Sequence, residues 1–143
     1  MLLWCISSFA TLDGQGGMSF SARWHNEGRR IVYTADHPAS ALLELLVHMD
    51  RALLPDSYQL LKIETQREIK PDRIVPPLGW NENLDVTRGI GDLWLRDSRT
   101  VLLEVPSAIL PDVFHTLINP AHPDARFLKI VGVQRVPLDA RLM

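Results

Sequence analysis

Residues 31–54 read IVYTADHPASALLELLVHMDRALL, and this stretch contains the clearest change from strand to helix in the chain. Residues 31–34 are β-branched and aromatic, a composition typical of a short strand. Pro38 stands where the first turn of a helix tolerates proline, and the pattern predicts a helix over 39–54. Apolar side chains recur there at helical spacing, and we expect them to form the main core stripe of a well-buried helix: Leu42, Leu45, Leu46, Met49 and Leu53.

A second stripe on the same predicted helix is polar. Ala41, Glu44, His48 and Arg51 follow one another at steps of three and four residues and therefore share a face. A carboxylate in a mostly apolar helix needs an explanation, because a buried carboxylate is rare unless it is paired. Glu44 is therefore the first candidate functional residue.

Outside this stretch the sequence predicts further strands, one more helix and a loop. Strands are expected over 2–7, 57–65, 100–105 and 127–136, a helix over 87–98, and a loop over 13–17, where three glycines stand in four positions. On the strand 57–65 we expect Tyr58, Leu60 and Ile63 to share one side. Because strands and helices do not alternate as βαβ units, the predicted fold class is α+β.

Length and composition limit the number of domains and the classes of function that this sequence can have. The 143 residues fit a single domain, and 46% hydrophobic with 22% charged residues is typical of a soluble globular protein. The formal charge is −2 and no run of Lys or Arg is present, so direct binding of nucleic acid is not expected. Cys5 is the only cysteine, which excludes an internal disulfide.

The short apolar start indicates a strand and not a signal peptide, and no stretch reaches the roughly 20 apolar residues of a membrane span. We therefore expect a cytoplasmic protein with no membrane contact.

Three general chemistries were weighed against these residues. The early glycines lack the Gly-x-Gly-x-x-Gly spacing of a dinucleotide-binding turn. Glu44 and His48 lie one helical turn apart, but no His-Glu-x-x-His pair is present, so no metal is expected. Ser107 follows a strand without a glycine elbow around it, and such a serine is more often a helix N-cap than a nucleophile.

Six short motifs in order are more specific than any of these features. They read ARWH at 22–25, IVYTA at 31–35, ALLELLVH at 41–48, GD-x-W at 91–94, VPSA at 105–108 and LINP-x-HP at 117–123. Together they resemble the RES-domain family, the toxin half of bacterial toxin–antitoxin pairs, over nearly the whole chain. The family takes its name from an arginine, a glutamate and a serine, which match Arg23, Glu44 and Ser107.

The resemblance implies a single RES domain over 1–143, with an ADP-ribosyltransferase-like split, mostly antiparallel sheet and a few packed helices. It implies NAD⁺ as the substrate, whose nicotinamide–ribose bond is cleaved by hydrolysis or phosphorolysis. It also implies an Xre-type helix-turn-helix antitoxin as partner, with a homodimer inside the toxin–antitoxin complex as one arrangement it allows. The antitoxin, not the toxin, would bind DNA.

The resemblance also gives the candidate site residues their roles. Glu44 would stabilise the positive charge that grows on the ribose, and Arg23 would clamp the pyrophosphate. Tyr33 would stack on nicotinamide, with its hydroxyl reaching Glu44 or the ribose. Ser107 would orient the glutamate or a ribose hydroxyl. Asn119 would bind the ligand or, alternatively, only hold the Asn-Pro turn together.

This sequence departs from the family pattern at a few positions. Cys5 stands where an arginine is expected, Ala22 where a glycine is expected, and His115-Thr116 where asparagine and an aromatic are usual. Two other functions therefore stay open beside NAD⁺ depletion. One is a protein ADP-ribosyltransferase, and the other is a catalytically weakened domain that mainly binds the antitoxin.

Overall fold

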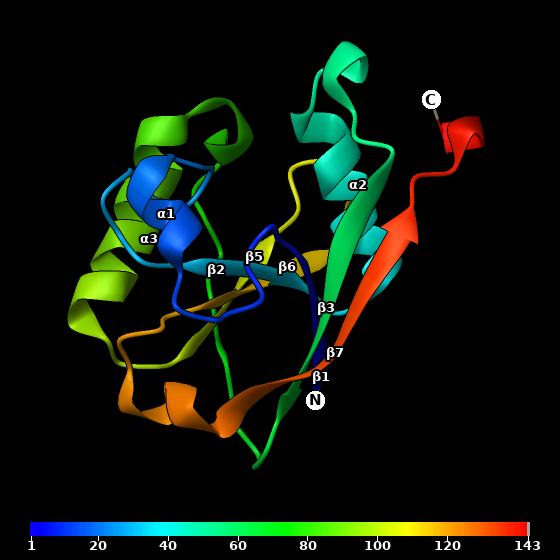
Figure 1. The fold of residues 1–143 in the computed structure, drawn as a ribbon. Coiled ribbons are helices and arrows are strands. Elements are labelled where there is room, and N and C mark those ends of the chain that lie inside the picture. Colours follow the sequence, from blue (N-terminus) through cyan, green and yellow to red (C-terminus); the bar gives the residue numbers. More distant parts are fainter. Residues whose placement is uncertain (143) are drawn as a thin grey trace.

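A seven-stranded sheet runs through the centre of the computed structural model, which describes residues 1–142 (Figure 1). The strands are β1 (Leu2–Ile6), β2 (Val32–Ala35), β3 (Ser57–Thr65), β4 (Asp72–Arg73), β5 (Leu102–Pro106), β6 (Phe114–Ile118) and β7 (Leu128–Pro137). Their order across the sheet is β4-β5-β6-β2-β1-β3-β7. Every neighbouring pair is antiparallel except β4 with β5.

The sheet is split between β1 and β2. These two strands share one register pair, Trp4 with Ala35, whereas β1 pairs with β3 over five positions and β2 with β6 over four. The halves β4-β5-β6-β2 and β1-β3-β7 therefore diverge at this point. The predicted α+β class, with a split and mostly antiparallel sheet, is confirmed.

Helix α2 (Pro38–His48) crosses the split and lies against β1 and β2. Its start is fixed by His37, whose Nδ1 accepts a hydrogen bond from the Ala39 amide, with Pro38 in the first turn as expected. It ends six residues earlier than predicted, because Asp50 caps a separate 3₁₀ turn, η1 (Arg51–Leu53). The expected burial was also wrong: no α2 residue is fully buried, and Leu53 is exposed. Of the apolar α2 side chains, Ala41, Leu45 and Val47 line a cavity beside the sheet.

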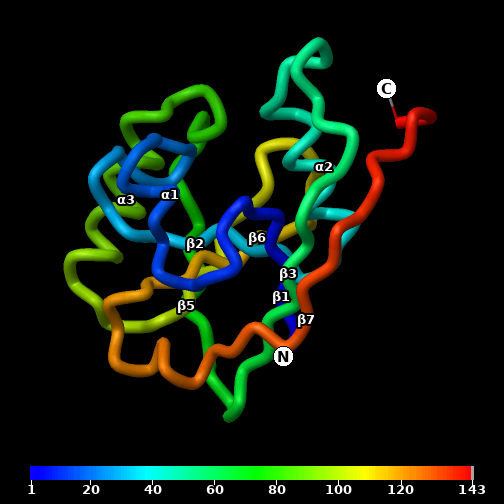
Figure 2. Tube along the Cα trace, in the orientation of Figure 1, coloured from blue at the N-terminus to red at the C-terminus, as the bar shows by residue number. Residues whose placement is uncertain are grey.

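Helices α1 (Gln15–Ser19) and α3 (Leu84–Asp97) lie away from α2 in Figure 1. Figure 2 traces the chain from β1 through α1 and back into β2. The loop predicted over 13–17 was therefore wrong in part. Its glycines permit close packing, since a Cβ on Gly17 would lie 2.3 Å from the Arg29 carbonyl oxygen.

Two further 3₁₀ turns, η2 (Trp80–Glu82) and η3 (Pro123–Phe127), shape the connections, and η4 (Ala140–Leu142) ends the described chain.

The core consists of two clusters on the sheet. One gathers apolar residues of β1, β3 and neighbouring strands, and the other fills the space between α3 and the β5-β6 pair. On β3 the fully buried residues are Leu61 and Ile63, whereas Leu60 is half-exposed, so the expected facing of Leu60 was wrong. The predicted strands and helix α3 otherwise lie within a few residues of their expected bounds.

Sequence patterns missed two strands, the two-residue β4 and the longer β6. Strand β6 follows a turn at Pro111-Asp112 and pairs with β2 on one side and β5 on the other, so it is central to its half of the sheet. Within residues 1–142 no helix is long and apolar enough to cross a membrane.

Candidate functional site

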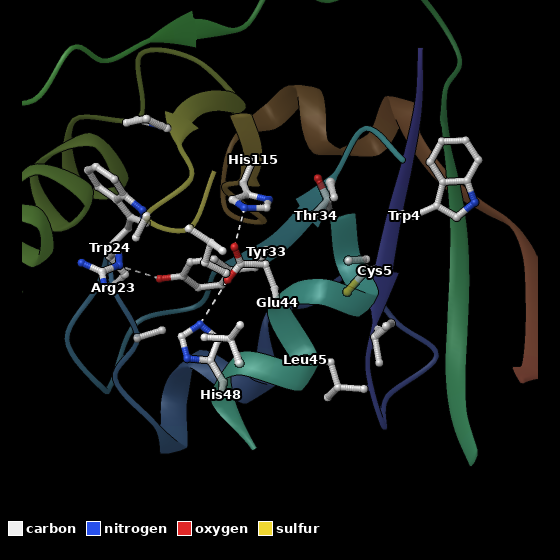
Figure 3. Close-up of a pocket in the computed structure, with 18 residues that line it drawn as sticks. Trp4, Cys5, Arg23, Trp24, Tyr33, Thr34, Glu44, Leu45, His48 and His115 are labelled. Atoms are coloured by element: carbon white, nitrogen blue, oxygen red, sulfur yellow. Dashed lines mark hydrogen bonds and ion pairs between the residues drawn. The ribbon is translucent and has the colours of Figure 1, made fainter. Parts of the chain in front are cut away.

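A cavity of about 420 Å³ opens where the sheet splits. Its walls come from β1, the segment before β2, β2 itself, α2, the turn after β5, and β6. Most of the lining is apolar, and the charged or titratable side chains among it are Cys5, Arg23, Tyr33, Glu44, His48 and His115. In Figure 3, Glu44 projects from α2 into the middle of this cavity, with Tyr33 beside it and Arg23 farther away, next to Trp24. Three of the five predicted site residues thus share one cavity.

Arg23 lies on a segment that α3 holds by its backbone. Thr87 Oγ1 donates a hydrogen bond to the Arg23 carbonyl oxygen at 2.6 Å, and Arg88 Nε donates to the Ala22 carbonyl oxygen at 2.9 Å. Gly91 allows this approach, because a Cβ there would lie 1.6 Å from the Trp24 carbonyl oxygen. This close packing explains why a glycine stands in the middle of α3. The two hydrogen bonds also fix the backbone position from which the Arg23 side chain extends.

The Arg23 side chain is weakly engaged. Its guanidinium donates one hydrogen bond, to the Asn81 carbonyl oxygen at 3.2 Å, and lies 5.9 Å from the ring centroid of Trp80. No carboxylate forms a salt bridge with it in residues 1–142. Its remaining donors are therefore free to bind an anion in the cavity.

Tyr33 lines the cavity, but its hydroxyl group is already hydrogen-bonded to other residues of the protein. The oxygen accepts a hydrogen bond from the Trp24 amide at 3.1 Å and lies 2.7 Å from Nδ1 of His25. His25 Nε2 lies 2.8 Å from the Phe20 carbonyl oxygen, which can only accept, so Nε2 carries the proton and Tyr33 donates to Nδ1. The expectation that this hydroxyl reaches Glu44 is not met, and the ring remains as the surface offered to a ligand.

Burial keeps both His25 and Tyr33 uncharged near neutral pH. Desolvation lowers the pKa of His25 despite the hydrogen bond to Phe20, and the imidazole is therefore neutral near pH 7. Desolvation also raises the pKa of Tyr33 well above its ordinary value. Trp24 and Tyr33 thus form a rigid, uncharged wall of the cavity, with His25 hydrogen-bonded to the Tyr33 hydroxyl.

Glu44 is held differently, between two histidines. Its Oε1 lies 2.8 Å from Nε2 of His115, and its Oε2 lies 3.2 Å from Nε2 of His48 (Figure 3). Burial by itself would raise the pKa of Glu44, but the hydrogen bonds and charges of His115 and His48 outweigh it and lower the pKa below the ordinary value. The cavity therefore presents an ionised carboxylate at neutral pH.

A second cavity of about 230 Å³ lies next to the first. Cys5, Ile6, Ala22 and Tyr33 line both cavities, which places the thiol between them. Burial raises the pKa of Cys5 to about 12, so the group behaves as a small neutral side chain and not as a nucleophile. The position where an arginine was expected is thus an apolar spot on a shared wall.

Ser107 and Asn119 lie outside the lining of either cavity. Ser107 Oγ accepts hydrogen bonds from the amides of Ile109 and Leu110, and Ile109 does line the larger cavity. Asn119 is buried; its amide nitrogen donates to the Leu95 carbonyl oxygen and its Oδ1 accepts from the Ala121 amide. Both residues therefore stabilise turns, and the structure does not bring them to a ligand.

Across residues 1–142, no three His, Cys, Asp or Glu side chains gather in a way that could hold a metal ion. The arrangement of cation, aromatic face and carboxylate suits an organic ligand with both anionic and polar parts. Sequence patterns did not predict the roles of His115 and His25. His115 stands on a strand that was missed, and the only signal was its departure from the family pattern.

Comparisons with known proteins agree with this geometry. The chain matches the RES domain family over residues 3–140. It is 42% identical to "Toxin Res" of Pseudomonas putida, covering 99% of each chain, and 37% identical to "Prs ADP-ribosylating toxin" of a Sphingobium species, covering 92% of this chain and 86% of that protein.

A solved structure shows the same fold. It is the Mycobacterium tuberculosis MbcT–MbcA toxin–antitoxin complex, which matches with a TM-score of 0.72 at 14% identity over 99% of this chain and 85% of the other. At that identity the likeness concerns the fold alone. Taken with the family match and the curated relatives, it leads to one conclusion: the chain belongs to the RES-domain toxin family.

Proposed function

We propose that this protein is the toxin of a toxin–antitoxin pair and that it cleaves the nicotinamide–ribose bond of NAD⁺. The observation that carries the proposal is the ionised Glu44 carboxylate in a mostly apolar cavity that also holds Arg23 and the face of Tyr33. Both cavities share a wall at Cys5 and Tyr33, which supports a ligand with two linked halves.

The bond to be broken determines what Glu44 does. Nicotinamide leaves as a neutral base with the electron pair of the C–N bond, so positive charge develops on the ribose. A fixed carboxylate stabilises that charge more strongly in an apolar cavity than in water. Water or phosphate then adds to the same carbon and gives up a proton, which Glu44 is placed to accept.

Arg23 and Tyr33 bind and orient the substrate in this proposal. The free donors of the guanidinium match the paired oxygens of a pyrophosphate. The ring of Tyr33, locked by His25, offers a flat face to nicotinamide. In this proposal Ser107 supports the turn that brings Ile109 into the wall, and Asn119 holds the turn that follows β6.

The direct experiment follows NAD⁺ over time with the purified, antitoxin-free protein and with Glu44→Gln. We expect the variant to stay folded and to lose at least about a hundredfold in rate, since one electrostatic group of this kind is worth that much. Parallel assays with and without phosphate separate phosphorolysis from hydrolysis. Full activity of Glu44→Gln would remove the carboxylate from the mechanism.

Arg23→Lys tests the pyrophosphate clamp. Lysine keeps the positive charge but loses the planar fork of donors, so we expect the KM for NAD⁺ to rise about tenfold with a smaller change in kcat. Steady-state kinetics measure both constants, with nicotinamide mononucleotide as the comparison substrate because it lacks the pyrophosphate. An equal KM for NAD⁺ in the two proteins would contradict the clamp.

A second candidate is transfer of ADP-ribose to a protein, because the Sphingobium relative is named as an ADP-ribosylating toxin. Labelled NAD⁺ would then leave label on a protein acceptor instead of in free product. As partner we propose an antitoxin of the Xre type, supported by the matched toxin–antitoxin complex. Whether two toxin copies join in that complex is measured by light scattering of the co-purified pair.

A further inference from the structure

We propose that His115 is a positioning residue that fixes the Glu44 carboxylate, and that His48 is an exchangeable contact that a bound substrate replaces. The inference rests on the role given to Glu44 in the proposed function. It adds a division of labour between two histidines that contact the same carboxylate at different oxygens.

The two contacts differ in length and in shielding from solvent. The His115 contact is 2.8 Å long and its side chain is 13% exposed, whereas the His48 contact is 3.2 Å and its side chain is 65% exposed. A charge-assisted hydrogen bond near 2.8 Å that is shielded from water is strong, and an exposed pair contributes little. Glu44 is therefore fixed from the His115 side.

The secondary-structure elements that carry the two histidines also differ in how firmly they are held. His115 lies in the middle of the sheet half, where β6 pairs Ala35 on one side and Val105 on the other. His48 is the last residue of α2, next to the turn that ends the helix. Movement of His115 would require the sheet to move, whereas His48 can leave by rotating its side chain.

The hydrogen-bond chemistry leaves one carboxylate oxygen for a ligand. Glu44 can only accept when ionised, so each imidazole donates through Nε2–H. A substrate hydroxyl that binds Glu44 takes the place of His48 at Oε2, while His115 keeps Oε1. The carboxylate thus stays oriented throughout, which a reaction that depends on alignment requires.

The other charged and titratable groups that line the cavity with Glu44 are Cys5 on β1, Arg23 before β2, Tyr33 on β2, His48 on α2 and His115 on β6. Burial raises the pKa of the Cys5 thiol to about 12 and raises the pKa of Tyr33, so both are neutral near pH 7. Only the two histidines contact the Glu44 carboxylate directly, so they determine how it is held.

This gives His115 an effect on kcat that a purely structural residue would lack. A side chain that keeps a hydrogen-bond donor at this position keeps Glu44 oriented and should preserve kcat, whereas an apolar side chain of similar size should not.

Three variants separate the roles by steady-state kinetics at one pH. His115→Leu removes the donor and should lower kcat by about ten- to a hundredfold, the range for a lost hydrogen bond to a charged group. His115→Gln keeps a neutral donor, so it should recover most of kcat. His48→Ala should lower KM by about two- to fivefold, because the substrate no longer competes with that contact.

A second measurement does not depend on turnover. At one fixed pH, the NMR signal of His115 Nε2 should change in Glu44→Gln, because its hydrogen-bond acceptor is no longer a carboxylate. The ring of His37, which caps the start of α2, serves as the reference signal and should not change.

The outcomes distinguish this inference from the proposed function. If the wild type cleaves NAD⁺ and Glu44→Gln does not, but His115→Leu keeps the wild-type kcat, the inference is wrong and the proposed function stands. If the wild type does not cleave NAD⁺, the NMR comparison decides: an unchanged His115 Nε2 signal in Glu44→Gln overturns the inference, and the expected change supports it.

Discussion

Two histidine-containing groups contribute to the same cavity and behave in opposite ways. In one, Tyr33 lines the cavity and is hydrogen-bonded to His25, and both side chains are largely buried, neutral and bonded to the backbone. In the other, Glu44 is half-exposed and ionised between His48 and His115. The same residue type thus serves as a neutral structural acceptor in one place and as the partner of a carboxylate in the other.

The difference follows from solvent and from the partner offered. Burial with only neutral partners removes the charged form of an imidazole, because the ion loses its hydration. A carboxylate beside the ring offsets that loss. The site therefore combines an uncharged wall with an ionised carboxylate.

The largest expected effect comes from breaking the rigid wall where α3 supports it. Gly91→Ala places a Cβ 1.6 Å from the Trp24 carbonyl oxygen, and this backbone cannot move without disturbing Tyr33. We expect a loss of about 3 kcal/mol or more in the free energy of unfolding, measured by urea denaturation. Gly89→Ala in the same helix meets no atom within 4 Å and is expected to stabilise by about 0.5–1 kcal/mol. Similar effects from the two substitutions would contradict the close packing.

A smaller effect is expected from His25→Gln, which leaves Tyr33 without its buried acceptor. We expect a loss of about 1–3 kcal/mol at pH 7. Because the pKa of His25 is lowered by folding, the unfolded chain binds the proton more readily, and His25 contributes less stability as pH falls below about 6.5. The difference between wild type and variant should therefore shrink on acidification.

Urea denaturation at several pH values measures this trend. His48→Gln is the control, since its exposed imidazole should change stability by no more than about 0.5 kcal/mol. A difference for His25→Gln that grows at low pH would show that His25 is not neutral in the folded protein.

The smallest effect on stability is expected for Glu44→Gln. The pKa of Glu44 is lowered in the folded protein, so the ionised form contributes stability above the ordinary pKa of about 4.5, and that contribution disappears as pH falls through the folded value. The carboxylate is partly exposed, so we expect a loss of no more than about 1 kcal/mol at pH 7 and almost none at pH 3. Thermal unfolding at both pH values checks this, and a loss that persists at pH 3 would indicate a packing defect.

Much of the fold could be predicted because its signals are local. The start of α2 follows from Pro38 and from helical spacing, α3 from its periodicity, and most strands from short β-branched runs. The end of α2 could not be predicted, because the apolar pattern continues past His48 while Asp50 starts a new turn. Strand β6 was missed because polar residues interrupt it and a turn separates it from its partner β5.

The candidate site divides in the same way. Arg23, Tyr33 and Glu44 were predicted from motifs and do line one cavity. Ser107 and Asn119 belong to the same set of motifs, but their side-chain oxygens accept hydrogen bonds from nearby backbone amides. A motif identifies residues that occur together, and it does not distinguish a ligand contact from the turn that supports it.

The sequence by itself determined the fold class, the family, and the helix that carries Glu44, because these depend on composition, spacing and short motifs. Only the tertiary structure decided which side chains meet the carboxylate, where the Tyr33 hydroxyl points, and that α2 lines a cavity instead of filling a core. The physical reason is distance along the chain. Glu44 and His115 are 71 residues apart, and their contact exists only after β6 has paired between β2 and β5.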